Sequence, residues 1–336
     1  MKTQKIDIIL PSRIGDSILS IPAIVCLEQL SKKYGSNLKI RVLSRPFLAE
    51  LLSSLELFNC KGMTLAQKCR SAIFPADKAF YIETTNNNLG YFSKESYGII
   101  NPFKKFLKFT HQPIYLQFSY NPFPETWESI KNSFPEGLVS FLQEKYGLGW
   151  YSISLFGICL ELGYSAEQIM ETFKFSPMIP EQTRDDKVVF CVEAGYGKKH
   201  LNERCWDTDG YFKIAEKCFE DFGIKSVFVG VNTETPLPDR EYIEDLRGKV
   251  SLLELANQMK SAHLYIGNDT GPMHIANLMN TPSVAVYFRE EHMAGFSPIF
   301  PEINTKVYRP ESIEPIYSEV VRILTPEYHL YLDPVI

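Results

Sequence analysis

The stretch HLYIGNDTGPMHIANLMNTPSVAVYF, residues 263–288, says most about the fold. The apolar run 263–267 is typical of a buried strand, residues 268–280 begin a helix after a polar turn, and residues 283–288 are apolar again. Two buried strands on either side of one helix indicate a β–α–β unit in an open parallel sheet. Ligands bind such sheets at the carboxyl ends of the strands, so the loop 267–274 is a candidate site.

The same alternation of apolar runs and amphipathic stretches extends through both halves of the chain. The first half has predicted strands at 6–10, 38–43 and 78–84, and predicted helices at 17–34, 47–55 and 150–174. The second half adds predicted strands at 188–193 and 225–230, and predicted helices at 208–222 and 251–262. Residues 86–135 show no clean period and are interpreted as irregular segments with short helices. The predicted fold class is therefore α/β, with two successive parallel-sheet halves.

The prolines and charges of KFSPMIPEQTRDDK, residues 174–187, indicate a linker between the two halves. We therefore predict an N-terminal domain over 1–174, a linker over 175–187 and a C-terminal domain over 188–310. Residues 311–336 are assigned to a C-terminal helix and tail, with packing back on the N-terminal domain as one option.

Composition narrows the classes of function. Forty acidic residues against 35 basic ones give a net charge of −5, which disfavours a general nucleic-acid binder. The seven cysteines are scattered without a C-x-x-C pair, so we expect neither a zinc site nor a disulfide framework, and a reducing cytoplasm is the natural setting. The N-terminal apolar run is short and broken by Pro11, and the apolar stretch near 150–160 is too short for a bilayer. These features predict a soluble protein without a signal peptide.

The turn at the start of the predicted helix has the features of an anion site. Pro272 suits the first helical turn, and a side chain just before it can cap the helix. Free N–H groups there would face outward with the positive end of the helix dipole, which suits a phosphate. The residues concerned are the cap candidates Asp269 and Thr270 and the N–H donors of Gly271, Met273 and His274. The alternative is a capped helix without a ligand. No metal is expected at His274, because no second His or Cys stands at ligand spacing on that helix.

The loop PSRIGDS, residues 11–17, follows the first predicted strand. Gly15 allows a tight turn, and Asp16 then lies at the carboxyl edge of the sheet just before a helix. A carboxylate in that position can act as a general base. The alternative is an ordinary N-cap, since aspartate is among the best capping residues.

The third candidate loop is EAGYGKKHLNERCW, residues 193–206. Gly195 and a second glycine precede Lys198, Lys199 and Arg204, and basic groups beside a glycine-rich loop suit an anionic ligand. The loop is not a P-loop, and the chain has no G-x-G-x-x-G, which counts against a dinucleotide site. The alternative is a solvated basic loop.

With these three loops, the chain resembles glycosyltransferase family 9, the bacterial heptosyltransferases of lipopolysaccharide core assembly. Residues 251–288 are similar to the family's signature almost from end to end, and their D-T-G-P-M-H core is specific. IDIILPSRIGDSILSIPAI, residues 6–24, resembles the family's first strand, its G-D turn and the helix that follows. RCWDTDGYFKIAE, residues 204–216, resembles the family's K-x-W-P segment.

The resemblance implies a GT-B fold, in which two Rossmann-like domains face each other across a cleft. It implies an inverting, metal-independent glycosyl transfer without a cofactor. The donor would be a nucleotide-linked sugar, with ADP-heptose expected, and the acceptor a lipopolysaccharide core or similar glycan. Asp16 would take the proton of the acceptor hydroxyl, and Arg204 with the loop 267–274 would stabilise the departing diphosphate. Glu234, in the loop after the strand 225–230, would bind the donor ribose.

Four departures from the family pattern bear on the substrates. Arg204 replaces the family's lysine, so Lys198 or Lys199 is an alternative for that role. Glu193 places an acid near the expected phosphates, where the family has N-P-G. The segment REEH, residues 289–292, replaces G-P-T near the donor, and Glu83 replaces an aspartate on the acceptor side.

Two other functions remain open at this stage. One is a nucleotide-sugar-binding or glycan-binding protein that has lost turnover, and the other is an epimerase of the UDP-N-acetylglucosamine type. The aromatic and lysine-rich stretch 91–127 is interpreted as packing, with sugar stacking or an anionic lipid surface as alternatives. We expect a cytoplasmic protein, with peripheral contact to the inner membrane as an option.

Overall fold

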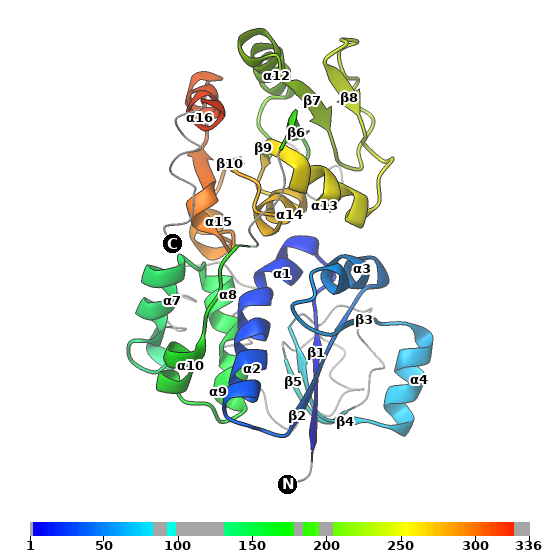
Figure 1. Ribbon diagram of the computed structural model, residues 1–336, viewed down its shortest axis with the longest axis vertical. Coiled ribbons are helices and arrows are strands. Elements are labelled where there is room, and N and C mark those ends of the chain that lie inside the picture. The colour runs from blue at the N-terminus through cyan, green and yellow to red at the C-terminus, as the bar shows by residue number, and fades with distance from the viewer. Residues whose placement is uncertain (1–2, 83–92, 99–130, 178–183, 195–203, 326–336) are drawn as a thin grey trace. The chain divides into compact units, whose positions relative to one another are not determined.

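The computed structural model describes residues 3–82, 93–98, 131–177, 184–194 and 204–325. It divides the chain into two compact units (Figure 1). Unit 1 contains residues 1–176 and 294–299, and unit 2 contains residues 177–293 and 300–336.

Unit 1 is built on a parallel sheet with the strand order β3-β2-β1-β4-β5. The strands are β1 Gln4–Ile9, β2 Leu38–Ser44, β3 Cys60–Gly62, β4 Ala76–Tyr81 and β5 Ser93–Gly98. Ile6 of the central strand pairs with Ile40 on one side and Lys78 on the other. Because the inner strands are buried from both faces, β1 is the apolar run that the sequence shows.

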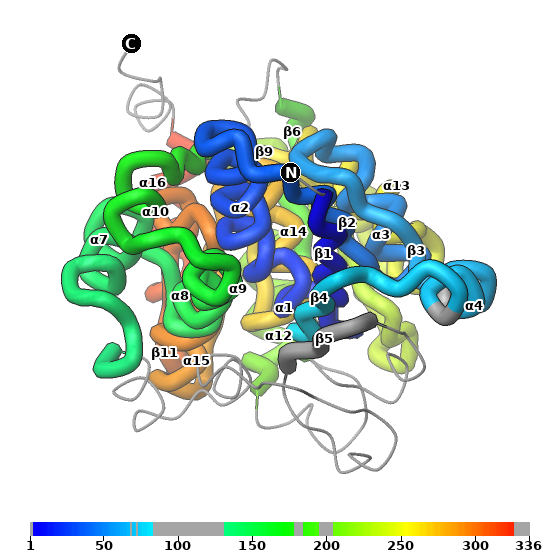
Figure 2. Tube along the Cα trace, turned by 90° about the horizontal axis from the view of Figure 1, so that it is seen from below, coloured from blue at the N-terminus to red at the C-terminus, as the bar shows by residue number. Residues whose placement is uncertain are grey.

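The helices of unit 1 lie on both sides of strand β1. The first four are α1 Ile14–Leu19, α2 Ile21–Lys33, α3 Pro46–Ser54 and α4 Leu65–Ile73. The next four are α7 Leu138–Tyr146, α8 Trp150–Leu155, α9 Gly157–Glu161 and α10 Ala166–Thr172. Helices α7 to α10 gather around α2 on one side of β1, and α3 and α4 lie on the other (Figure 2). The Gln29 side chain on α2 bonds the main chain of Lys174 in both directions, which ties α2 to the end of α10.

Unit 2 repeats the design with the strand order β11-β10-β9-β6-β7-β8, again parallel throughout. The strands are β6 Asp185–Cys191, β7 Lys225–Phe228, β8 Ile243–Asp245, β9 Ala262–Asn268, β10 Ser283–Tyr287 and β11 Asn304–Tyr308. The helices are α12 Thr208–Phe222, α13 Leu252–Ser261, α14 Gly271–Leu278, α15 Glu290–Gly295 and α16 Glu314–Leu324, with a short 3-10 turn at Pro301–Ile303.

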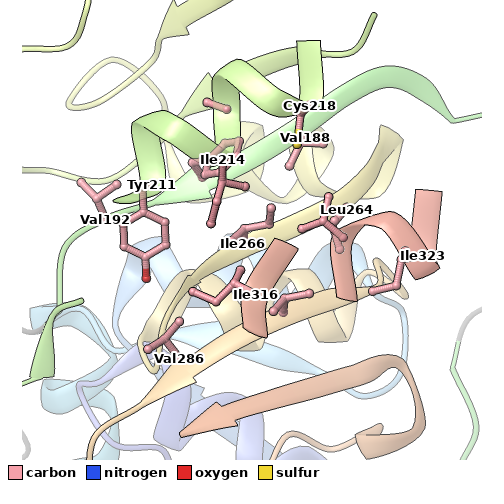
Figure 3. Close-up of a cluster of buried hydrophobic side chains, with 14 of the residues drawn as sticks. Val188, Val192, Tyr211, Ile214, Cys218, Leu264, Ile266, Val286, Ile316 and Ile323 are labelled. Carbon is pink, nitrogen blue, oxygen red and sulfur yellow. The ribbon is translucent and has the colours of Figure 1, made fainter. Parts of the chain in front are cut away.

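One face of this second sheet carries a large apolar core. Side chains of β6, β9 and β10 meet those of α12 and α16, as Figure 3 shows for Val188, Ile214, Leu264, Ile266, Val286, Ile316 and Ile323. The predicted ends of two helices are confirmed. Helix α12 stops at Gly223, whose φ of 67° suits glycine, and Ser251 and Glu254 form the expected capping box of α13.

Two predictions about these elements were wrong. The helix predicted at 17–34 begins at Ile14 and breaks at Ser20, because Pro22 has no N–H to continue the ladder. Residues 93–98 form a strand rather than an irregular segment. The polar sequence of β5 shows no period, and its place at the edge of the sheet comes from main-chain pairing with β4.

The structure also describes most of the segment that was assigned to a C-terminal helix and tail. Helix α16 packs into the core of unit 2, where its apolar face covers β9, β10 and β11, and residues 326–336 of the same segment lie outside the described chain. The described chain also places 294–299 in unit 1, and β6 begins at Asp185, inside the segment predicted as linker.

Candidate functional site

Two basic side chains of unit 2, Arg204 and His292, contact the carboxylate of Asp269 at the carboxyl end of β9. Arg204 Nη2 lies 2.8 Å from Asp269 Oδ2 and 2.6 Å from the main-chain oxygen of the same residue. His292 Nδ1, from α15, lies 3.0 Å from the same Oδ2 atom. The three residues are far apart in the sequence, and the order β10-β9-β6 brings the loops that carry them together.

Asn268 holds this cluster in place from beneath. Its side chain is fully buried, and its Oδ1 accepts hydrogen bonds from the Trp206 main-chain N–H and the Tyr211 hydroxyl, both at 2.9 Å. Its Nδ2 donates to the Val192 carbonyl, also at 2.9 Å. Because Trp206 is two residues from Arg204, these bonds fix the segment that carries the guanidinium. Sequence reasoning missed Asn268, although an asparagine that ends an apolar strand is a signal for such a role.

Close approach of two strands requires a glycine next to Asn268. A Cβ atom at Gly267 would lie 2.6 Å from the carbonyl oxygen of Cys191 on β6. Real Cβ atoms do not come so near to a main-chain oxygen, so a larger residue would push the strands apart. The glycine of the Y-I-G-N-D-T-G motif therefore serves the packing of β9 against β6.

The contacts of Asp269 determine the charge of its carboxyl group. Burial raises the pKa of this carboxyl, but the hydrogen bond from His292 and the charge of Arg204 outweigh it and lower the pKa below its usual value. The carboxylate is therefore ionised at neutral pH. Burial lowers the pKa of the Lys306 ammonium, against the attraction of Asp269, and Nζ donates to the Met293 carbonyl at 3.1 Å.

His274 is buried beside this cluster with its ring neutral. Its exposed fraction is 5%, and burial lowers its pKa to about 4 despite the nearby charge of Asp269. Within the described residues, Nδ1 of His274 makes no hydrogen bond.

The start of α14 differs in part from the prediction. Pro272 lies in the first turn, as expected, and Thr270 holds the N-cap position, but its side chain makes no capping hydrogen bond. The N–H groups of Met273 and His274 are not free, because both donate to the carbonyl of Thr270. The expectation that these two N–H groups are free was wrong. The N–H of Gly271 makes no hydrogen bond within the part of the chain that the structure describes.

Arg204 keeps donors available. Both of its hydrogen bonds leave from Nη2, to the carboxylate and the main-chain oxygen of Asp269. Nε and Nη1 make no hydrogen bond with any described residue. One side of the guanidinium is therefore tethered, and the other side has donors for an anion.

The carboxylate of Glu193 is bound by the main chain of the loop after β7. Its carboxylate accepts hydrogen bonds from the N–H groups of Val231, at 2.6 Å, and Asn232, at 2.8 Å. The Asn232 side chain in turn accepts from the N–H of Glu234. Glu193 thus fixes the loop that presents the exposed Glu234.

Asp16 lies in unit 1, inside the first turn of α1. It is not the N-cap, which is Arg13, so the capping interpretation was wrong. Its exposed fraction is 7%, and its Oδ2 lies 3.9 Å from Arg13 Nη1. The Ser17 hydroxyl donates to the Pro11 carbonyl at 3.0 Å, which closes the turn 11–17 around it.

Several predicted residues lie outside the described chain. These are Gly195, Lys198, Lys199, Glu83 and the stretch 91–127 apart from the main chain of β5. Among the described residues, no group of three or more His, Cys, Asp or Glu side chains could hold a metal ion.

The described chain has one helical stretch, 14–33, that is long and apolar enough to cross a membrane. Sequence reasoning did not single it out. The segment is 72% buried in the fold, and core helices of soluble proteins pass the same test.

Comparison with known proteins identifies the fold and a region similar to one known family. The sequence profile described as glycosyltransferase family 9 (heptosyltransferase) matches residues 157–305. Residues 157–305 are thus the part of the chain that is similar to glycosyltransferase family 9. This family 9 region contains Arg204, Asn268, Asp269 and His292.

The relatives agree with this family. Lipooligosaccharide heptosyltransferase 2 of Haemophilus influenzae is 30% identical over 107 residues, which cover 29% of this chain and 30% of that protein. The match therefore spans less than a third of the relative's length.

Solved structures extend the likeness to both units. The ADP-heptose heptosyltransferase II of E. coli matches with a TM-score of 0.67 at 15% identity, over 96% of this chain and 99% of that one. The E. coli heptosyltransferase WaaC with ADP matches with a TM-score of 0.58 at 13% identity, over 95% and 100%. At such identities the likeness shows the fold, which is GT-B with two Rossmann-like units.

Proposed function

We propose that this protein is a glycosyltransferase that moves heptose, or a related sugar, from a nucleoside-diphosphate donor to a lipopolysaccharide core or similar glycan. The similarity of residues 157–305 to family 9 supports this reaction class. The observation that carries the proposal is the one-sided tether of Arg204 to Asp269 at the carboxyl end of β9. We expect ADP-heptose as the donor, because a solved structure of the same fold holds ADP.

A diphosphate fits this cluster by charge. Arg204 and His292 contact the ionised carboxylate of Asp269, Lys306 interacts with it electrostatically, and the Nε and Nη1 donors of Arg204 have no described partner. Fixed basic groups at this place stabilise the negative charge that develops as the bond to the sugar breaks. We propose that Arg204 binds the diphosphate, together with the Gly271 N–H and the Thr270 hydroxyl.

The remaining donor contacts are assigned by likeness to the family. Glu234 is proposed to bind the ribose, and the bonds of Glu193 to the preceding loop support this, since they fix its main chain. Asp269 is proposed to contact the donor through Oδ1, since Arg204 and His292 both bind Oδ2. Gly195, Lys198, Lys199, Met273 and His274 stay as candidate residues around the donor.

Asp16 is proposed as the general base of the transfer. It would take the proton of the acceptor hydroxyl, whose oxygen attacks the anomeric carbon on the side opposite the leaving nucleoside diphosphate. The carbon–oxygen bond to the diphosphate then breaks, and the product has inverted configuration. The closed turn 11–17 supports the assignment, because it fixes a carboxylate at the carboxyl edge of its sheet.

The reaction is proposed to need no metal and no cofactor, since arginine supplies the positive charge at the leaving group. The acceptor is proposed to be a glycan or lipid-linked saccharide and not a nucleic acid. The proposed location is the cytoplasm, with peripheral contact to the inner membrane where lipid-linked acceptors lie.

A thermal-shift series with ADP, UDP, GDP and CMP in EDTA tests the donor. A ligand that binds the native state alone raises the free energy of unfolding by about 2.7 kcal/mol at a hundredfold excess over its Kd. We expect a clear shift with ADP. A shift with UDP or GDP alone would replace the donor, and no shift would contradict the proposed diphosphate site. ADP binding without transfer would favour a binding protein that has lost turnover.

A further inference from the structure

His292 comes from the segment REEH, in which this chain departs from the family pattern at a place near the expected donor. Its Nδ1 shares the Oδ2 atom of Asp269 with Nη2 of Arg204, at 3.0 and 2.8 Å. The side chains of His292 and Asp269 are 17% and 10% exposed, so both lie mostly out of water. A shared acceptor of this kind links the histidine to the guanidinium through one oxygen.

The hydrogen bond fixes the chemistry of the imidazole. An ionised carboxylate has only acceptors, so Nδ1 of His292 must carry the proton in this contact. The backbone also holds the ring in place. The N–H groups of His292 and Met293 donate to the Arg289 carbonyl, and the Met293 carbonyl accepts from Lys306 on β11. The start of α15 is thereby anchored to the sheet of unit 2.

Without this contact the carboxylate would have a different set of partners. Oδ2 of Asp269 would lose one of its two basic neighbours and would be left with Arg204. The guanidinium could then turn more of its donors toward the carboxylate, since a bidentate arginine–carboxylate pair is the stronger arrangement. Donors used in that way are lost to a ligand.

We propose that His292 is a positioning residue for nucleoside-diphosphate binding, which shares the Asp269 carboxylate with Arg204 and so keeps Nε and Nη1 of Arg204 directed to the diphosphate. This inference rests on the proposed function, because the ligand is the donor nucleotide. It assigns a role to a segment that the family pattern does not explain. It also implies that the effect of His292 concerns the diphosphate and not the nucleoside.

The test compares His292→Phe with His292→Asn by calorimetric titration with ADP and, separately, with adenosine. Phenylalanine keeps a ring of similar size without a donor, whereas the asparagine amide restores an N–H close to the position of Nδ1. We expect His292→Phe to weaken ADP binding about tenfold, as expected for a lost hydrogen bond to a charged group. His292→Asn should remain within about threefold of wild type, a difference of about 0.6 kcal/mol. Adenosine affinity should change in neither variant.

His263→Phe is the matched control. His263 also lies in unit 2 and uses its Nδ1 in one hydrogen bond, to the Asp185 carbonyl at 2.7 Å, away from Asp269. It should leave the ratio of ADP to adenosine affinity unchanged, and melting temperatures of all variants report on folding.

The outcomes distinguish the role of His292 from the proposed function. Wild-type ADP affinity in His292→Phe, or equal losses in the Phe and Asn variants, overturns the role of His292 and leaves the proposed function standing. A parallel loss of ADP and adenosine affinity shows a general structural role and also overturns it. If the wild-type protein binds no nucleoside diphosphate, the proposed function fails and this inference fails with it.

Discussion

The Oδ1 atom of Asn268 accepts a hydrogen bond from the main-chain N–H of Trp206 at 2.9 Å, and this bond sets the position of the catalytic cluster proposed here. It connects the end of β9 with the segment that follows β6. Arg204 precedes Trp206 by two residues, and Asp269 follows Asn268 directly. One buried amide therefore brings the guanidinium and its carboxylate together, before any ligand binds.

Replacement of Asn268 by alanine should affect stability and binding together. The change leaves the Trp206 N–H, the Tyr211 hydroxyl and the Val192 carbonyl without their partner. We expect a loss of about 2–4 kcal/mol in the free energy of unfolding, measured by urea denaturation, because buried polar groups stay unsatisfied. Calorimetry should show weaker ADP binding in the folded variant.

Asn277→Ala is the control for this experiment. Asn277 is also fully buried, and its amide makes two hydrogen bonds to the main chain of Phe300. Its loss should lower stability to a similar degree and leave ADP affinity near that of wild type. Equal losses of ADP affinity in both asparagine variants would show that the effect of Asn268 comes from stability alone.

The role of Arg204 predicts a difference between charge and geometry. Arg204→Lys keeps a positive charge but loses the planar fork that holds Asp269 through Nη2 and leaves Nε and Nη1 for the ligand. ADP affinity should fall by about tenfold in Arg204→Lys and by about a hundredfold in Arg204→Gln, measured by calorimetry. Unchanged ADP affinity in Arg204→Gln would place the diphosphate elsewhere.

Asp16 predicts a separation of turnover from donor binding. Asp16→Asn keeps the size of the side chain and removes the base, so the rate of sugar transfer should fall by about 10²- to 10⁴-fold. Calorimetric affinity for ADP should stay the same, because Asp16 lies in unit 1 and the donor contacts are assigned to unit 2. Transfer at the wild-type rate in this variant would remove Asp16 from the mechanism.

The buried His274 predicts that stability falls in mild acid. Its pKa is about 4 in the folded protein, against 6.5 for an ordinary histidine, because burial disfavours the charged ring. Between pH 6.5 and 4 the unfolded chain therefore takes up a proton that the native protein refuses, and stability decreases as the pH falls. The loss from this group should reach about 3 kcal/mol by pH 4.

Urea denaturation between pH 7 and pH 4 measures this effect, with His274→Gln as the comparison. The variant cannot titrate, so its stability should depend less on pH over that interval. Asp269 adds a loss in the same direction only at lower pH, below its unfolded value of 3.8, since its pKa is lowered. Identical pH profiles for wild type and variant would contradict the neutral state of His274.

The sequence was informative where the hydrophobic period of an element and the residues that cap or end it agree. The strands β6, β9 and β10, the glycine end of α12 and the capping box of α13 could all be predicted, because each depends on neighbouring residues. Strand β5 could not be predicted, since main-chain pairing with β4 decides it. The break at Ser20 was missed, although the missing N–H of Pro22 that causes it is a local feature of the sequence. At the site, too, local motifs could be predicted and tertiary contacts could not.

Local motifs indicated Asp269, Thr270 and Arg204 as parts of an anion site. They gave no sign that His292 shares the carboxylate of Asp269, because that contact joins α15 to the end of β9 through the tertiary fold. Nor did they show that Glu193 is satisfied by the N–H groups of Val231 and Asn232. Sequence reasoning placed this acid near the expected phosphates without a partner for its carboxylate.

The most direct test of the central claim is a transfer assay. The protein is incubated in EDTA with ADP-heptose and a lipopolysaccharide core that lacks heptose, and ADP release and the acceptor mass are followed together. We expect ADP release that depends on the acceptor, with a gain of one heptose on the glycan. Binding of ADP without any gain of sugar on the acceptor would contradict it.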